Sequence, residues 1–162
     1  MVRAAAMKRV RVGTIEVVLG RKALPESFDA VVVVLFCDGK PVLVRDERRA
    51  WEFPGGRREG TETFEETASR EVYEEAGVAI EDVEYLGYYV TSTGLVAVIA
   101  SAKASSFERL EGKVGSAEVR LFSELPLELS FGDGREQLFL DTAFALGLDR
   151  DSGVGNQTRK GE

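Results

Sequence analysis

Hydrophobic and polar positions in the first third of the chain predict three strands. Residues Val10–Leu19 alternate loosely between apolar and polar side chains, and Ala30–Cys37 is an unbroken apolar run rich in β-branched residues. Such a run is typical of a strand that is buried on both faces. A third strand, Pro41–Arg45, follows the pair Asp38-Gly39, which is a strong signal for a tight hairpin turn. The pattern therefore predicts an antiparallel pair at this point.

After the third strand the alternation stops and a helical period begins. Trp51–Gly56 contains a proline and two glycines, and we expect a loop because neither a helix nor a strand tolerates these residues together. Thr61 or Thr63 can cap a helix that runs from about Thr63 to Ala76, and Gly77 is suited to end it. Its apolar stripe recurs at every fourth residue and comprises Phe64, Ala68, Val72 and Ala76.

The second half of the chain predicts three more strands and a second helix. Val83–Val90 and Leu95–Ala102 form a hairpin pattern, and Glu118–Phe122 predicts another strand. The polar stretch Ser105–Ser116 between them is expected to be a loop. A helix is expected from Gly134 to about Gly147. The order β, β, β, α, β, β, β, α favours an α/β or α+β sandwich.

Length and composition indicate one globular domain. The chain has 162 residues, of which 44% are hydrophobic and 30% charged, so we expect a single domain over residues 1–148 and a flexible tail over 149–162. The longest apolar run, Val31 to Cys37, is far shorter than the roughly 20 residues that cross a bilayer. The short basic N-terminus has no apolar stretch of signal length, so a cytoplasmic location is expected and no membrane partner.

The residue types that are missing exclude several chemistries. The chain has one cysteine, Cys37, and no histidine, which excludes an intrachain disulfide framework, a multi-cysteine zinc site and a Ser-His-Asp triad. Acid and base catalysis must then use carboxylates, lysine, tyrosine or the thiol. The net charge of −7 argues against general attraction to nucleic acid. Residues 52–75 hold eight acidic and three basic residues, so this stretch contributes −5 of that charge.

Three glutamates within the acidic stretch share one face of the predicted helix. Glu71, Glu74 and Glu75 stand at positions i, i+3 and i+4, and like charges at this spacing destabilise a helix unless something positive lies between them. Oxygen ligands on an open face suit Mg²⁺ or Mn²⁺. The backbone of Gly55-Gly56, which lacks side chains, can approach the same ion closely. We expect this acidic face to point toward solvent.

The spacing Gly56, five residues, Glu62, seven residues, Arg70-Glu71-Val72, one residue, Glu74-Glu75, one residue, Gly77 resembles the Nudix box at every defining position. The resemblance to the Nudix hydrolase family implies an α/β/α sandwich with a mixed sheet. It also implies metal ligation by Glu71, Glu74 and Glu75 with a carbonyl of Gly55 or Gly56, with Glu71 a candidate general base. Arg70 would orient the glutamates, and Glu62 is expected to support the loop and the helix start rather than to bind metal. A later acidic residue, Glu118 or Glu111, could complete the metal site.

The resemblance also implies contacts with a phosphorylated substrate. Arg45, Gly55, Arg57 and Arg58 are the expected substrate-binding residues, and Asp133 or Gln137 could contact a base. Trp51 could stack on a base or belong to the core, and the core is the simpler interpretation for it.

Within the family, the sequence and length of the chain look most like those of the nucleoside triphosphate diphosphatases of the MutT and YtkD type. The reaction this implies is Mg²⁺-dependent cleavage of a nucleoside triphosphate, such as 8-oxo-dGTP, to a monophosphate and pyrophosphate. The alternatives are removal of pyrophosphate from the 5′ end of RNA, hydrolysis of another nucleoside diphosphate derivative, and a nucleotide sensor without activity. The expected partner is a small nucleotide with no stable nucleic-acid partner, and the expected state is a monomer or homodimer.

Overall fold

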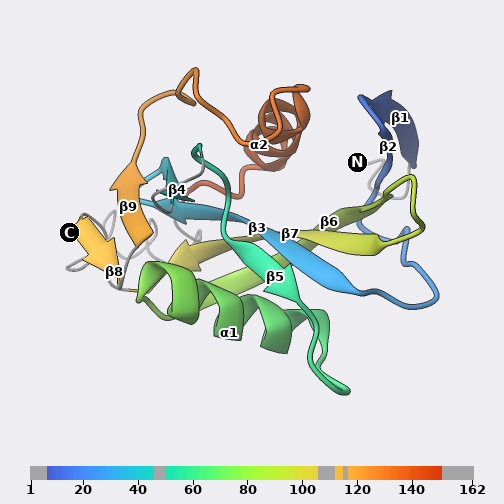
Figure 1. Ribbon diagram of the computed structural model, residues 1–162, viewed down its shortest axis with the longest axis horizontal. Coiled ribbons are helices and arrows are strands. Elements are labelled where there is room, and N and C mark those ends of the chain that lie inside the picture. The colour runs from blue at the N-terminus through green and yellow to red at the C-terminus, as the bar shows by residue number, and fades with distance from the viewer. Residues whose placement is uncertain (1–6, 46–49, 106–111, 115–116, 151–162) are drawn as a thin grey trace, which may run out of the picture.

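The computed structural model describes residues 7–45, 50–105, 112–114 and 117–150. Within these residues the chain forms nine strands and two helices (Figure 1). In chain order they are β1 (Lys8–Val12), β2 (Ile15–Leu19), β3 (Ala30–Cys37), β4 (Lys40–Arg45), β5 (Gly55–Arg57), α1 (Phe64–Ala76), β6 (Ile80–Val90), β7 (Val96–Ala104), β8 (Gly112–Val114), β9 (Ala117–Leu121) and α2 (Arg135–Ala145).

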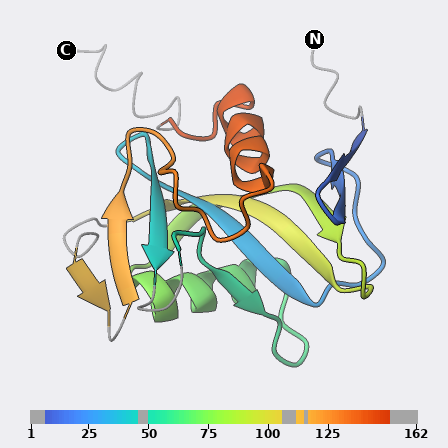
Figure 2. The same ribbon diagram turned by 45° about the horizontal axis from the view of Figure 1, so that its top comes forward.

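The strands form one sheet in the order β1-β2-β6-β7-β3-β4-β9-β8, and β5 adds to β3 beside β4. Every pairing is antiparallel except that of β3 with β7, which is parallel. Helix α1 lies on one face of this sheet and α2 on the other, as the two ribbon views show (Figures 1 and 2). The expected α/β/α sandwich with a mixed sheet is therefore confirmed.

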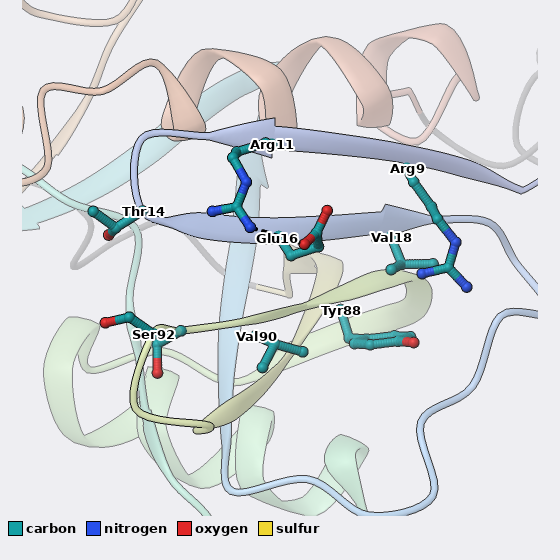
Figure 3. A pocket seen from close by; sticks show the side chains of 9 residues that line it. Arg9, Arg11, Thr14, Glu16, Val18, Tyr88, Val90 and Ser92 are labelled. Atoms are coloured by element: carbon teal, nitrogen blue, oxygen red, sulfur yellow. Dashed lines mark hydrogen bonds and ion pairs between the residues drawn. The ribbon is translucent and has the colours of Figure 1, made fainter.

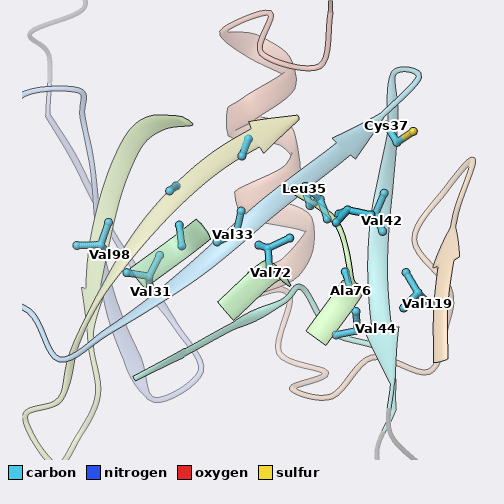
Figure 4. Close-up of a cluster of buried hydrophobic side chains, with 14 of the residues drawn as sticks. Val31, Val33, Leu35, Cys37, Val42, Val44, Val72, Ala76, Val98 and Val119 are labelled. Atoms are coloured by element: carbon cyan, nitrogen blue, oxygen red, sulfur yellow. The ribbon is translucent and has the colours of Figure 1, made fainter. Parts of the chain in front are cut away.

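Strand β3 supplies the core of both layers. Val31, Val33 and Leu35 point to the α1 side and pack with the buried stripe of that helix (Figure 4). Val34 and Phe36 point to the opposite side, where they join the cluster that contains Phe139 and Leu140 of α2. Because successive side chains of a strand alternate between faces, a strand buried on both sides must be apolar throughout. This explains the unbroken run that predicted it.

Local signals place both ends of α1. The Thr63 side chain accepts a hydrogen bond from the backbone of Glu66, and the Glu66 side chain accepts one from the backbone of Thr63, which is a capping box. At the other end Gly77 takes the left-handed conformation, with φ of 75°, and its N–H bonds to the Tyr73 carbonyl. The predicted helix is thus confirmed, and its register fixes where its glutamates point.

Three segments differ from the expectation. Val10–Leu19 is two strands, because Gly13 has a φ of 54° and turns the chain back on itself. Part of the expected loop Trp51–Gly56 is paired, since Gly55 and Gly56 lie in β5, opposite Val32 and Val31 of β3. Gly112–Val114 is a strand within the stretch expected to be a loop.

The remaining differences concern element ends and the limits of the described chain. The last strand is Ala117–Leu121 rather than Glu118–Phe122. Of the predicted tail, residues 151–162 lie outside the described residues, as does Glu111. In the described part of the chain, no helix has the length and apolar character needed to cross a membrane.

Candidate active site

Two glycines bring the β5 backbone directly against the acidic face of α1. A Cβ atom on Gly56 would overlap the carboxylate of Glu71, and one on Gly55 would overlap the Val31 carbonyl of β3. The Gly55 N–H donates a hydrogen bond of 3.1 Å to Oε1 of Glu75. Only residues without a side chain allow β5 to lie between β3 and these two glutamates. The structure therefore brings Gly55, Gly56, Glu71 and Glu75 together, as the motif predicts.

Arg70 lies at the centre of the site and joins the loop to the helix. Its guanidinium donates to both carboxylate oxygens of Glu62, at 2.7 and 3.0 Å, and to the Arg57 carbonyl at 2.8 Å. It also donates to Glu71 at 3.0 Å and to Glu74 at 3.3 Å. These contacts are those expected of a residue that orients the glutamates. They also place the one positive charge that carboxylates at this spacing require.

Glu62 fastens the loop that precedes α1. Besides Arg70, its carboxylate accepts hydrogen bonds from the Glu59 N–H at 3.0 Å and from the buried Thr67 hydroxyl at 2.8 Å. Hydrogen bonds from Arg70 and from the Glu59 backbone lower the pKa of Glu62 from 4.5 to about 2, and the same pairing raises the pKa of Arg70. Such contacts are those of the supporting role expected for Glu62.

The acidic face is not uniformly exposed, which corrects the expectation from the sequence. The Glu74 side chain is 55% exposed, but that of Glu71 is only 13% exposed. The reason is β5, whose Gly56 lies against Glu71. Burial raises the pKa of Glu71, an effect that the hydrogen bond from Arg70 opposes.

The types of ligand atom at this site suit a hard divalent cation. Three carboxylates and the backbone carbonyls of β5 provide only oxygen ligands, the type that Mg²⁺ and Mn²⁺ prefer. Gly56 leaves room for close approach, since a Cβ there would fill the space beside the Glu71 carboxylate. Among the described residues, no three acidic or thiol side chains already converge on a common ligating point. A shared site would require Glu71 and Glu74 to turn away from Arg70.

Arg57 and Arg58 follow Gly56 directly, whereas Arg45 and Glu118 point to the face of the sheet opposite α1. The roles of all four stay predictions. Arg57 ends β5, and the Arg58 guanidinium lies 4.5 Å from the centre of the Phe28 ring. Arg45 donates to Glu118 at 2.8 Å, and Arg120 bonds to the other oxygen of that carboxylate at 2.7 Å. The hydrogen bond from Arg45 lowers the pKa of Glu118. Both oxygens of Glu118 are therefore engaged by arginines rather than turned toward α1.

The residues considered for base contact have other partners. Asp133 accepts two hydrogen bonds from the Arg135 guanidinium through Oδ2, at 3.2 and 2.8 Å, and Gln137 donates to Asp141 at 2.8 Å. Trp51 is 3% exposed and packs edge-on against Phe122, so it belongs to the core.

One buried acid beside them is absent from the sequence analysis. Glu136 is 2% exposed, and its Oε1 has no hydrogen-bond partner among the described residues. Burial raises the pKa of Glu136. Its Oε2 accepts a hydrogen bond of 3.2 Å from the Phe131 N–H. The signal was present in the sequence, because Glu136 shares the i, i+3, i+4, i+7 face of α2 with Phe139, Leu140 and Ala143.

Comparison with known proteins agrees with this geometry. The family model described as NUDIX domain matches residues 27–134. YtkD of Bacillus subtilis (strain 168), which is named for 8-oxo-dGTP diphosphatase activity, is 30% identical over 140 residues, 85% of this chain and 89% of that protein. A MutT-like protein of Streptomyces ambofaciens is 40% identical over 81 residues, which are 49% of this chain and 53% of that protein.

Solved structures share the fold. A mutant of the Bacillus subtilis pyrophosphohydrolase BsRppH superposes with a TM-score of 0.74 and 28% identity, over 89% of this chain and all of that one. A MutT structure from a study of Aliivibrio salmonicida and Vibrio cholerae superposes with a TM-score of 0.54 and 18% identity, over 70% of this chain and 92% of that one. The second likeness concerns the fold alone.

Substitution of Glu62 by Gln is expected to change how stability depends on pH. The folded pKa of Glu62 is depressed to about 2 from 4.5, so its ion pair stabilises the fold above pH 4.5, and this stabilisation is lost as the pH falls from about 4.5 to about 2. At pH 6 the free energy of unfolding should be larger for the wild-type protein than for Glu62→Gln, and this difference should be smaller at pH 3. Urea unfolding of both proteins at the two pH values measures the difference. Glu26→Gln, which removes an exposed glutamate, should differ from the wild-type protein by the same unfolding free energy at both pH values. A difference for Glu62→Gln that does not become smaller at pH 3 would contradict the ion pair assigned to Glu62.

Replacement of Gly56 by Ala is expected to displace Glu71. The added methyl group would overlap the Glu71 carboxylate, and a shift of about 1 Å in a catalytic group can lower the rate about 100-fold. Steady-state hydrolysis of nucleotides, with circular dichroism to verify the fold, measures this loss. Ser69→Ala, which changes an exposed small residue of α1 outside the acidic face, is the control. Equal losses in both variants would show that the close approach at Gly56 is unimportant.

Proposed function

This chain belongs to the Nudix hydrolase family and is an enzyme of that family, and from this premise we propose that it cleaves nucleoside triphosphates to a nucleoside monophosphate and pyrophosphate. The observation that carries the proposal is the contact between the β5 glycines and the glutamates of α1. It sets the β5 backbone beside Glu71 and Glu75, next to a loop with two arginines. Such a set can hold a cation and a polyphosphate together.

Nudix hydrolases use divalent metal ions, and we propose Mg²⁺, with Mn²⁺ as a substitute, for this one. Glu71, Glu74 and Glu75 with the Gly56 carbonyl would hold it, and Glu118 could join only by releasing Arg45 or Arg120. When bound, the ion polarises the phosphoryl oxygens and lowers the pKa of a bound water. The cation also compensates the local negative charge, which favours approach of the polyphosphate.

The remaining steps use side chains of this chain. Glu71 is the proposed general base, because its partly buried carboxylate lies against the Gly56 backbone, beside the proposed cation. Arg70 would keep its hydrogen bonds to Glu62 and to the Arg57 carbonyl when Glu71 and Glu74 turn toward the cation, and would so keep the loop fixed to the helix. Arg57, Arg58 and Arg45 would contact phosphate oxygens, and the Gly55 backbone would lie beside them.

The preferred substrate proposed here is an oxidised purine nucleotide such as 8-oxo-dGTP. The likeness to YtkD, which spans 85% of this chain, supports this choice. The second candidate is removal of pyrophosphate from the 5′ end of RNA, which breaks the same kind of bond. The superposition on BsRppH, a pyrophosphohydrolase, supports this second candidate. A cytoplasmic location and a monomeric or homodimeric state also stay predictions from the sequence.

A panel of substrates tests the proposed function. The panel contains the ordinary nucleoside triphosphates, 8-oxo-dGTP, ADP-ribose and a short 5′-triphosphorylated RNA, each with and without Mg²⁺. We expect monophosphate and pyrophosphate from one or more triphosphates only when the metal is present. Release of single phosphates would contradict the proposed bond, and lack of turnover on every triphosphate would overturn the proposal.

Glu75→Gln is expected to abolish turnover while the protein stays folded. The amide keeps the size of the side chain but removes the negative charge that would bind the cation. Measurement of pyrophosphate release beside thermal unfolding separates activity from stability. Glu65→Gln, an isosteric change on the same helix outside the acidic face, should leave the rate unchanged. Full activity of Glu75→Gln would show that the metal assignment is wrong.

A further inference from the structure

A second concave site lies on the sheet, outside the residues assigned to catalysis. It is a cavity of about 400 Å³ on strands β1, β2 and β6, on the turn between β1 and β2 and on the turn that follows β6 (Figure 3). Nine residues line it: Arg9, Arg11, Thr14, Glu16, Val18, Tyr88, Val90, Thr91 and Ser92. It lies on the same face of the sheet as α1. The opposite face of β2, with Ile15, Val17 and Leu19, packs in the cluster that includes α2.

Strand pairing aims the two arginines into this cavity. Arg9 lies opposite Val18 and Arg11 opposite Glu16 in the β1–β2 register, and residues directly opposite one another share a face. Val18 is 2% exposed and forms an apolar floor. In Figure 3 the Arg9 guanidinium and the Tyr88 ring lie at one end of the cavity, and Thr14 and Ser92 lie at the other. Charge, an aromatic face and hydroxyl groups thus line one hollow.

The charges in the cavity are unevenly compensated. Arg11 forms an ion pair of 3.0 Å with Glu16. Arg9 has no ion-pair partner among the described residues, although the chain carries a net charge of −7. A guanidinium binds phosphate oxygens well, a tyrosine ring offers a face for base stacking, and hydroxyl groups can bond to a sugar. An exposed sheet face with this combination is suited to single-stranded nucleic acid.

The cavity is connected to the catalytic loop by a short path across the sheet. The Arg58 N–H donates to the Asp29 carbonyl, and the Asp29 N–H donates to Val96 of β7. Val96 pairs with Val90, which lines the cavity and pairs with Glu16. The strand registers connect Gly56 of the catalytic site to Tyr88 through three strand spacings, about 14 Å, and to Arg9 through five, about 24 Å. An RNA of a few nucleotides can span this separation.

We propose that this cavity binds one or two nucleotides of a single-stranded RNA whose 5′ triphosphate occupies the catalytic site. The phosphodiester lies on Arg9, and a base lies on the Tyr88 ring. The inference rests on the second candidate of the proposed function, and it narrows the substrate to 5′-triphosphorylated RNA. The net negative charge limits this contact to a weak one, consistent with a substrate that must leave after each turnover.

The test measures binding separately from hydrolysis. Fluorescence anisotropy with a labelled eight-nucleotide RNA that bears a 5′ hydroxyl reports binding without any reaction. Arg9→Glu is expected to weaken binding about tenfold at low salt and to reduce the slope of log affinity against log salt by about 1. Tyr88→Leu, which keeps an apolar side chain but removes the ring, should weaken binding as well. Hydrolysis of free nucleoside triphosphates by both variants should match that of the unvaried protein.

Lys40→Glu is the matched control, because it makes the same change in net charge. Lys40 is exposed and pairs with Cys37 at the far end of β3, so this variant should bind the RNA as the unvaried protein does. Equal affinity in the unvaried protein and Arg9→Glu, or an equal loss in Lys40→Glu, would overturn the proposal. If the unvaried protein binds the RNA through Arg9 but hydrolyses no triphosphate, the proposed function fails and the binding cavity stands.

Discussion

The contact between the Arg70 guanidinium and the carboxylates around it is the interaction on which the site depends. Glu71 and Glu74 stand on the same side of α1 and repel one another unless a positive charge lies between them. Arg70 supplies that charge and also bonds to Glu62 and to the Arg57 carbonyl. One side chain therefore attaches helix, loop and β5 to each other. A lysine could not do this, because a single ammonium cannot present a planar set of donors to so many acceptors.

A steric constraint acts beside this electrostatic one. Strand β5 fits between β3 and α1 only because Gly55 and Gly56 have no side chains. The same closeness buries Glu71, which raises its pKa, and sets the Gly55 N–H against Glu75. The glycines thus determine both the shape of the site and the chemical difference between the buried Glu71 and the exposed Glu74.

Local features of the sequence were sufficient for the parts of the fold that depend on near neighbours. The capping box of Thr63 and Glu66, the left-handed Gly77 and the apolar run of β3 all act within a few residues, and the predicted bounds of α1 and β3 agree with the structure. The motif likewise located the glutamates, because a helix fixes their spacing. Strand β5 was missed because its pairing with β3 joins residues far apart in the chain. The burial of Glu71 follows from that pairing and was missed with it.

The cavity on β1, β2 and β6 could not be predicted from the sequence either, because strand pairing creates it. Arg9 and Arg11 share a face because they stand two residues apart in β1. They lie opposite Val18 and Glu16 only because Gly13 turns the chain back as a hairpin, and the cavity exists only because β6 lies beside β2. The net charge of the chain also gives no indication of the arginines in this cavity. The total of −7 is dominated by the segment around α1, where a cation would neutralise the excess. Charges separated by more than about 10 Å are screened, so an RNA that approaches this protein responds to the charges close to it. Arg9, which has no ion-pair partner in the described part of the chain, can therefore attract a phosphate even though the whole molecule is acidic.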